Sequence, residues 1–269
     1  MLKMANISGF DMGKTIEWYT QSEVKLPETS VESKIPYQII NPGRIELTGR
    51  ELSGLYDLFP SQARERMIVS QIIGQRSSWF RKDSTTTQPI PTNNLEEALS
   101  PTAIIPSYID YSEWRASGKP TANIWIYEIM KELAPHNIRK IIAGEGFLHE
   151  LGHAIVQPAA YINDYKLKLP SGKEVFGLDC LMDLANIAEQ APPISHYASL
   201  YRGPTGHFDS PEEGYNLLTS ISEEIVETIA ALLIGFAYSG DDSISKNPFA
   251  HREEMKRATT DFLHAEKVN

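Results

Sequence analysis

The chain has 269 residues, of which 41% are hydrophobic and 22% are charged. This composition is typical of a globular protein with one large domain, or with a catalytic domain and a small companion. A formal net charge of −10 argues against a nucleic-acid-binding protein, which usually carries a basic patch. The single cysteine, Cys180, excludes an internal disulfide framework and a cysteine-rich zinc site.

Neither a Sec signal peptide nor a membrane-spanning helix is expected. The N-terminal stretch, MLKMANISGFDMGK, lacks the apolar segment of a signal peptide. The longest apolar run, at 225–237, contains Glu227 and is shorter than the roughly 18 apolar residues that a spanning helix needs. We therefore expect no membrane partner, and a protein that is cytoplasmic or is exported or injected without a Sec signal.

Residues 1–100 are expected to form an N-terminal extension and helical subregion, packed on a catalytic domain at 101–269. The stretch 82–101 is rich in Thr, Pro, Ser and Asn, which indicates a loop or linker at this boundary. Composition and residue spacing predict further elements before it. These are short extended pieces at 37–40 and 44–47, and helices over 51–78.

After this boundary the sequence predicts strands first and helices later. Residues 102–109 and 122–127 are rich in β-branched and aromatic residues, and SGKP at 117–120 forms a turn between them. Residues 129–157 follow as one or two helices, which Pro158 is expected to end. The other expected elements are a hairpin of 165–169 and 173–178, helices at 179–190 and 220–238, and an amphipathic helix with a frayed end at 245–269.

The stretch GEGFLHELGHAIVQP contains His149, Glu150 and His153 in the pattern H-E-x-x-H. On a helix, residues four apart project from one face, so the two imidazoles can bind one ion. Glu150 lies close enough to hold a water molecule, as in the helix of a zinc peptidase. A surface helix with a chance histidine pair is the alternative. The apolar residues around the motif favour a buried helix, where His and Glu need partners.

Two histidines do not complete a catalytic zinc site, which takes three protein ligands. The extended pattern H-E-x-x-H-x-x-G-x-x-H is excluded, because Val156 and Ala159 stand where it needs Gly and His. A carboxylate from a downstream helix is the remaining common solution. Glu223 and Glu227 lie four apart in an apolar stretch, so one can ligate while the other accepts a hydrogen bond from a ligating histidine.

Other assignments of these carboxylates stay open. Ser220 and Glu223 also match a helix-capping box. Glu224 can instead be the ligand or a solvent-facing charge, and Glu227 can be the ligand or the partner of a Lys or Arg. The more distant ligand candidates are Asp179, Asp183, His196 and His207.

Three motifs together resemble the lethal factor-like gluzincins, the group that also contains the Pro-Pro endopeptidases. They are HELGH at 149–153, SHYA at 195–198 and EEIVE at 223–227. The resemblance implies that Glu223 is the ligand, that Glu227 supports a ligating histidine, and that the Tyr197 hydroxyl helps to polarise the scissile carbonyl. The chain departs from the family pattern at Val226, where the family usually has Ala, and in the long stretch 199–222.

The expected fold is therefore α+β and mostly helical. It is a zincin-like catalytic domain with a small mixed sheet, an active-site helix and a downstream glutamate helix. In such peptidases the strand just before the metal-binding helix usually lies at the sheet edge, where an extended substrate pairs with it. Residues 122–127 fit that place as well as they fit an ordinary core strand.

The expected function is that of a zinc-dependent endopeptidase acting on a peptide or protein. One Zn²⁺ is held by His149, His153 and Glu223, while Glu150 is the general base. Tyr197 donates a hydrogen bond to the developing oxyanion.

His196 and Tyr201 are alternative donors. Two other functions remain open, namely a zincin-fold metal-binding regulator or interaction module with little proteolysis, and a structural helix without metal. The presence of Glu150 argues against the regulator, because a binding module has no need of that base.

Overall fold

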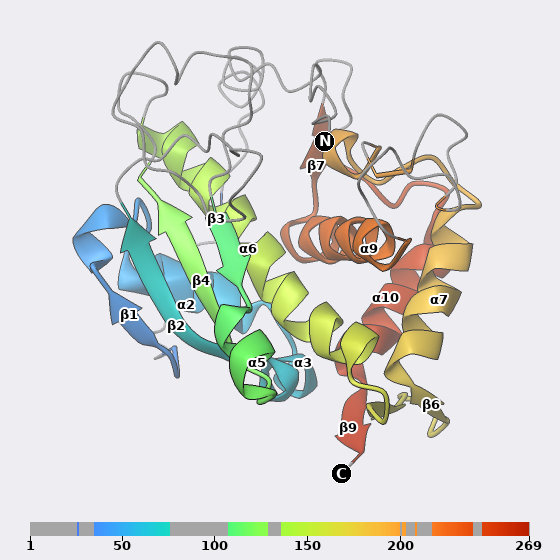
Figure 1. Ribbon diagram of the computed structural model, residues 1–269. Coiled ribbons are helices and arrows are strands. Elements are labelled where there is room, and N and C mark those ends of the chain that lie inside the picture. The colour runs from blue at the N-terminus through green and yellow to red at the C-terminus, as the bar shows by residue number, and fades with distance from the viewer. Residues whose placement is uncertain are drawn as a thin grey trace, which may run out of the picture. The chain divides into compact units, whose positions relative to one another are not determined.

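The structure is a computed structural model with a mixed α+β fold (Figure 1). It describes residues 26, 35–75, 107–128, 136–199, 201, 202, 208, 217–238 and 244–268. Its contacts divide the chain into two compact units: unit 1 is Met1–Leu55 with Val69–Leu148, and unit 2 is Tyr56–Ile68 with His149–Asn269. The expected boundary between residues 100 and 101 lies outside the described residues and stays a prediction.

Unit 1 contains a four-stranded mixed sheet in the order β1-β2-β4-β3. Its strands are β1 (Gln38–Ile40), β2 (Val69–Gln75), β3 (Ser107–Asp110) and β4 (Ala122–Tyr127). Strands β1, β2 and β4 run parallel to one another, and β3 is antiparallel to β4. The register places Ile72 opposite Ile124, and both side chains are fully buried. The sheet therefore has its apolar centre on β2 and β4.

Strand β2 replaces the last part of the helix expected over 51–78. The structure instead has α2 (Gly49–Asp57), α3 (Ser61–Arg66) and then β2. The apolar residues here fit a helical spacing, but β2 is paired on both sides and Val69, Ile72 and Ile73 are all buried. A strand inside a parallel sheet reads as an apolar run rather than an alternation. The extended piece expected at 44–47 does not form a strand, because Arg44 ends a 3₁₀ helix, η1 (Pro42–Arg44), and no strand follows at 45–47.

Strand β4 is an interior strand, flanked by β2 and β3. Of the two placements left open for 122–127, the structure shows the core strand rather than the sheet edge, because both sides of this strand already have backbone partners. The strand expected at 102–109 is confirmed from Ser107 onward, and its earlier part lies outside the described residues. A short helix that the sequence did not indicate, α5 (Ser112–Ser117), precedes the expected turn, where Gly118 adopts a positive φ of 71°.

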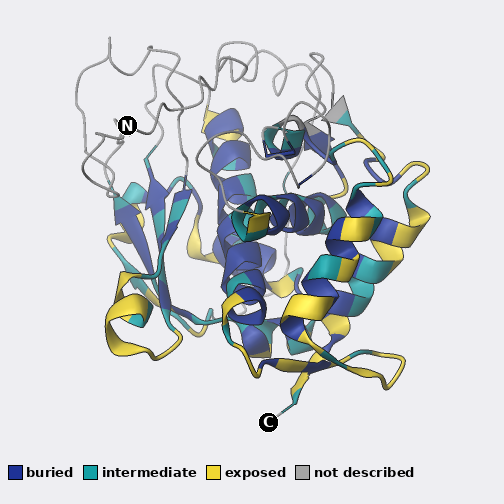
Figure 2. Cartoon of the chain, turned by 45° about the vertical axis from the view of Figure 1, so that its right-hand side comes forward, coloured by how far each residue is buried: buried dark blue, intermediate teal, exposed yellow. Residues whose placement is uncertain are grey.

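Helix α6 (His136–Tyr161) is continuous and buried over nearly its whole length (Figure 2). The expectation that Pro158 ends it is wrong. Proline has no N–H to donate to Ala154 O, four residues earlier. The Ile68 N–H donates to that carbonyl instead, at 3.4 Å. The helix tolerates Pro158 because another segment of unit 2 supplies the missing hydrogen bond.

The rest of unit 2 is largely helical. Its elements are β5 (Lys166–Lys168), β6 (Glu174–Phe176), α7 (Gly177–Ala188), α8 (His196–Ser199), α9 (Leu217–Ile234), β7 (Ala237–Tyr238), β8 (Ile244–Ser245), α10 (Glu253–His264) and β9 (Glu266–Val268). Helix α7 packs against α9 and α10. The expected hairpin is confirmed as β5 and β6, with Gly172 in its turn at φ 85°.

Two predicted helix ends in unit 2 differ from the structure. Helix α9 ends at Ile234, because Gly235 takes a positive φ of 78° that favours glycine. The chain after α10 is not a frayed helix end but strand β9, which pairs antiparallel with β5. Among the described helices, none combines the length and the apolar character needed to cross a membrane.

Candidate metal centre

Helix α6 presents His149 and His153 on one face, one turn apart, as their spacing predicts. Their rings lie 4.7 Å apart between centroids and cross at 75°. The two Nε2 atoms are 3.1 Å apart.

Helix α9 brings Glu223 to the same point. Its Oε2 atom lies 3.3 Å from His149 Nε2 and 3.4 Å from His153 Nε2. The three atoms therefore form a nearly equilateral triangle. In a tetrahedral zinc site with ligands at about 2.0–2.2 Å, neighbouring ligand atoms are about 3.3–3.6 Å apart. The residues thus fit one zinc ion without rearrangement of the helices.

The close approach of α6 and α9 depends on Gly152. A Cβ atom at this position would lie 3.0 Å from Cγ1 and 3.4 Å from Cγ2 of Val226. The first distance is shorter than ordinary van der Waals contact and the second is at its limit. A residue without a Cβ atom therefore leaves space for the side chain of Val226. Gly152 lies directly before His153, and Val226 lies between Glu223 and Glu227. Packing at the ligands is therefore set by this pair.

The electrostatics of the cluster favour a cation. Burial alone would lower the pKa of His149, but the neighbouring carboxylates of Glu223 and Glu227 outweigh it and raise this pKa well above its ordinary value. Burial alone would raise the pKa of Glu223, but His153 and His149 outweigh it and lower this pKa. Both directions show that positive charge is stabilised between the side chains, and either a proton or a metal ion supplies it.

Glu227 contacts the back of His149 rather than the triangle. Its Oε1 atom lies 2.7 Å from His149 Nδ1. A carboxylate only accepts hydrogen bonds, so Nδ1 donates to Glu227, and Nε2 is the nitrogen that faces Glu223 and can bind an ion. This is the arrangement expected for a carboxylate that orients a ligating histidine. The alternative in which Glu227 pairs with a Lys or Arg is not what the structure shows.

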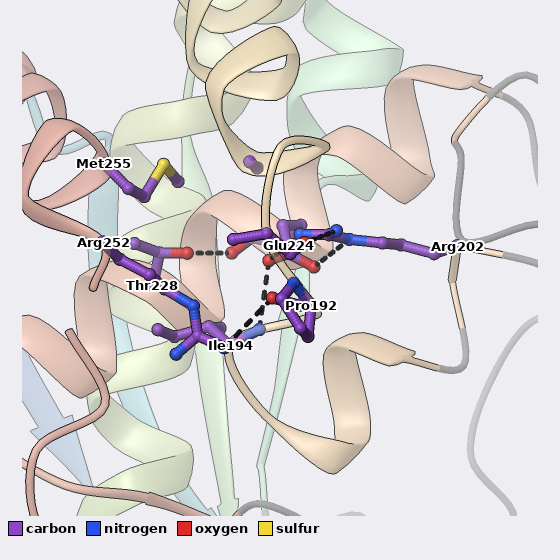
Figure 3. Close-up of a pocket in the computed structure, with 9 residues that line it drawn as sticks. Pro192, Ile194, Arg202, Glu224, Thr228, Arg252 and Met255 are labelled. Atoms are coloured by element: carbon purple, nitrogen blue, oxygen red, sulfur yellow. Dashed lines mark hydrogen bonds and ion pairs between the residues drawn. The ribbon is translucent and has the colours of Figure 1, made fainter. Parts of the chain in front are cut away.

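Glu224 turns away from the cluster into a buried ion pair (Figure 3). Its two carboxylate oxygens accept hydrogen bonds from Arg202 Nε and Nη2, at 3.0 and 2.7 Å. The Ile194 N–H adds a third, at 3.3 Å. Glu224 is 1% exposed, so the expectation of a solvent-facing charge is wrong. No sequence pattern indicated Arg202, because it lies 22 residues earlier in an irregular segment.

Glu223 is not part of a capping box. Helix α9 begins at Leu217, so Ser220 is already inside the helix and fully buried. A capping serine would have to precede the first helical residue. The carboxylate of Glu223 is therefore free of that role.

Tyr197 lies on α8, with its ring against one of the two histidines. The Tyr197 ring meets the His149 ring edge to face, with centroids 5.6 Å apart. Its hydroxyl lies 2.7 Å from that of Tyr201. Burial, followed by the charge of Glu223, raises the pKa of Tyr197 well above its ordinary value. The phenol therefore stays protonated and can donate a hydrogen bond.

The remaining predicted residues divide into three cases. Glu150 is buried on α6, directly after His149. Asp179 and Asp183 lie exposed on α7 and do not belong to the cluster. The side chain of His196 and all of His207 lie outside what the structure describes. Among the described residues, the group suited to a metal ion is His149, His153 and Glu223.

Comparison of the chain with protein-family models, with curated proteins and with solved structures gives no match.

Proposed function

We propose that the chain is a zinc-dependent endopeptidase with His149, His153 and Glu223 as its zinc ligands. The observation that carries this proposal is the triangle of Nε2, Nε2 and Oε2 atoms, with sides of 3.1, 3.3 and 3.4 Å. Its size matches one face of a zinc tetrahedron, which leaves the fourth position for water or substrate. A structural ion would need a fourth protein ligand at that position.

The protein side chains divide the chemistry between them. A zinc ion held by these three ligands would act as a Lewis acid that polarises a carbonyl and acidifies water. Glu150 accepts the proton of the attacking water and later delivers it to the leaving amine. Tyr197 keeps its phenolic proton and donates a hydrogen bond to the oxygen on which negative charge develops.

Support for a gluzincin-like, zincin-type domain comes from two helices that carry the motifs. One bears H-E-x-x-H and the other bears Glu223 with Glu227 four residues later. The hydrogen bond from His149 to Glu227 agrees with the role that the family resemblance implies for the second glutamate. The edge-to-face contact of Tyr197 with His149 supports it as the donor in preference to Tyr201.

Metal content and cleavage test the proposal together. Purified, unchelated protein is analysed for zinc, and a peptide library is incubated with it before and after chelation. We expect near-stoichiometric zinc and cleavage that chelation abolishes and zinc restores. Absence of zinc would reject the metal site and leave a structural helix. Zinc without any cleavage, by contrast, would identify a metal-binding regulator.

A further inference from the structure

A buried serine, Ser195, contacts both Glu227 and helix α8 beside the proposed zinc site. Ser195 Oγ donates a hydrogen bond to Glu227 Oε2, at 2.6 Å. The same oxygen accepts one from the Ala198 N–H, at 3.0 Å. Ser195 is 5% exposed. A single hydroxyl thus contacts both the carboxylate that orients His149 and the backbone of α8.

The contact with Ala198 is an N-cap. Ser195 directly precedes α8, and its oxygen satisfies a backbone N–H in the first turn of that helix. The hydroxyl proton is then left to point at Glu227. Because Glu227 accepts from His149 through its other oxygen, hydrogen bonds run without a break from the helix of Tyr197 to a zinc ligand.

We propose that Ser195 is a positioning residue that holds Glu227 against His149 and thereby couples the ligand to α8; this inference rests on the proposed function. Glu227 has two oxygens, and only one contacts His149. Ser195 occupies the other and prevents the carboxylate from rotating away. Bonds that polarise one another along such a chain also strengthen each other. A capping role alone would not require the contact with Glu227.

A second contact keeps this segment in place without Ser195. Glu224 accepts a hydrogen bond from the Ile194 N–H and pairs with Arg202, on either side of α8. Removal of the serine hydroxyl should therefore leave α8 docked on α9. The effect of the substitution can then be read as a loss of orientation rather than of the fold.

Zinc affinity, measured by competition with a chromophoric chelator, tests this inference. Ser195→Ala should weaken zinc binding by about tenfold, the lower end of the range for residues that support a ligand. Ser195→Gly should weaken zinc binding as much as Ser195→Ala does. Glycine is a better N-cap than alanine, so an equal loss shows that the missing hydroxyl, rather than a poorer cap, is the cause. Ser195→Thr, which keeps the hydroxyl, should bind zinc with the wild-type affinity. Ser220→Ala is the matched control, because this buried serine has no hydrogen-bond partner among the described residues.

A double-mutant cycle separates orientation from general packing. In a Glu227→Ala background, Ser195→Ala should cause no further loss of zinc affinity, because the carboxylate that it orients is gone. If Ser195→Ala binds zinc as wild type does, or if its effect persists without Glu227, the inference is wrong while the proposed function stands. If the wild-type chain binds no zinc, both are wrong. Should Ser195→Ala fail to fold, Ser195→Gly answers the same question.

Discussion

At the scale of single residues, Glu150 is the side chain that separates hydrolysis from metal binding. Glu150→Ala removes the proposed base but none of the three ligands. We expect the variant to keep its zinc and to lose cleavage by about 10²–10⁴-fold, the usual contribution of a general base. Zinc content and the rate on a peptide substrate are measured on the same preparation. Cleavage at the wild-type rate would show that Glu150 is not the base.

Glu223 and Glu227 are predicted to differ in how strongly they affect the metal. Glu223→Ala removes a ligand and should abolish stoichiometric zinc. Glu227→Ala removes the hydrogen-bond acceptor of His149 and should weaken zinc by about 10–100-fold. The zinc dissociation constants of the two variants show which substitution weakens binding more. If Glu227→Ala has the greater effect, the ligand assignment passes to Glu227.

Arg202 is predicted to matter for stability rather than for the metal. Arg202→Ala leaves the carboxyl group of Glu224 in a buried position without its cationic partner. Breaking such a pair typically costs about 3–5 kcal/mol of unfolding free energy. Urea unfolding measures the loss, and Arg202→Met with Glu224→Leu should recover much of it. A small effect of Arg202→Ala would mean that the pair adds little to the fold.

The local part of the site could be predicted from sequence, and its distant contacts could not. The pairing of His149 with His153 follows from the period of one helix. The glutamate-rich apolar stretch indicates a carboxylate ligand but leaves Glu223, Glu224 and Glu227 open, and the family resemblance implies Glu223. Ser195 contacts Glu227 and Arg202 contacts Glu224, partners that lie 32 and 22 residues later in the chain. No helical or strand period relates residues at such separations, so their partners emerge only in the folded chain.

At the scale of elements, the spacing of α6 and α9 is predicted to set the metal affinity. Gly152→Ala places a Cβ atom 3.0 Å from Cγ1 of Val226. The helices must move or the valine must shift, so we expect weaker zinc binding and a modest loss of stability, about 1–3 kcal/mol. Val226→Ala, combined with Gly152→Ala, should restore the affinity.

Gly49→Ala serves as the control for this experiment. It also places an alanine in a helix, but a Cβ atom there would meet nothing within 4 Å. Its zinc affinity should equal that of wild type. If Gly152→Ala also binds zinc normally, or if Val226→Ala gives no rescue, the helix spacing does not limit ligand geometry.

The elements that the sequence misassigned share a physical cause. The sequence predicts a helix at β2 because its apolar residues fit a helical spacing, and only pairing with β1 and β4 makes it a strand. The sequence predicts a helix end at Pro158 because the N–H of Ile68, which donates to the carbonyl that Pro158 leaves without a donor, comes from a distant segment. Strand β9 likewise exists through its pairing with β5. In each case a tertiary contact overrides a local preference.

At the scale of the whole molecule, zinc is predicted to stabilise the fold, because the ligands meet only in the folded chain. His149 and His153 lie on α6 and Glu223 lies on α9, so the unfolded chain offers a histidine pair without its carboxylate. An ion that binds only the folded state, at a free concentration of about 100 times its Kd, adds about 2.7 kcal/mol to the unfolding free energy.

Calorimetric unfolding should therefore show Tm rising with zinc concentration and falling after chelation. Glu223→Ala should show no such dependence, whereas Glu150→Ala should show it in full because its ligands are intact. If the Tm of the wild-type chain does not change with zinc concentration, the ligands do not form a zinc site on folding.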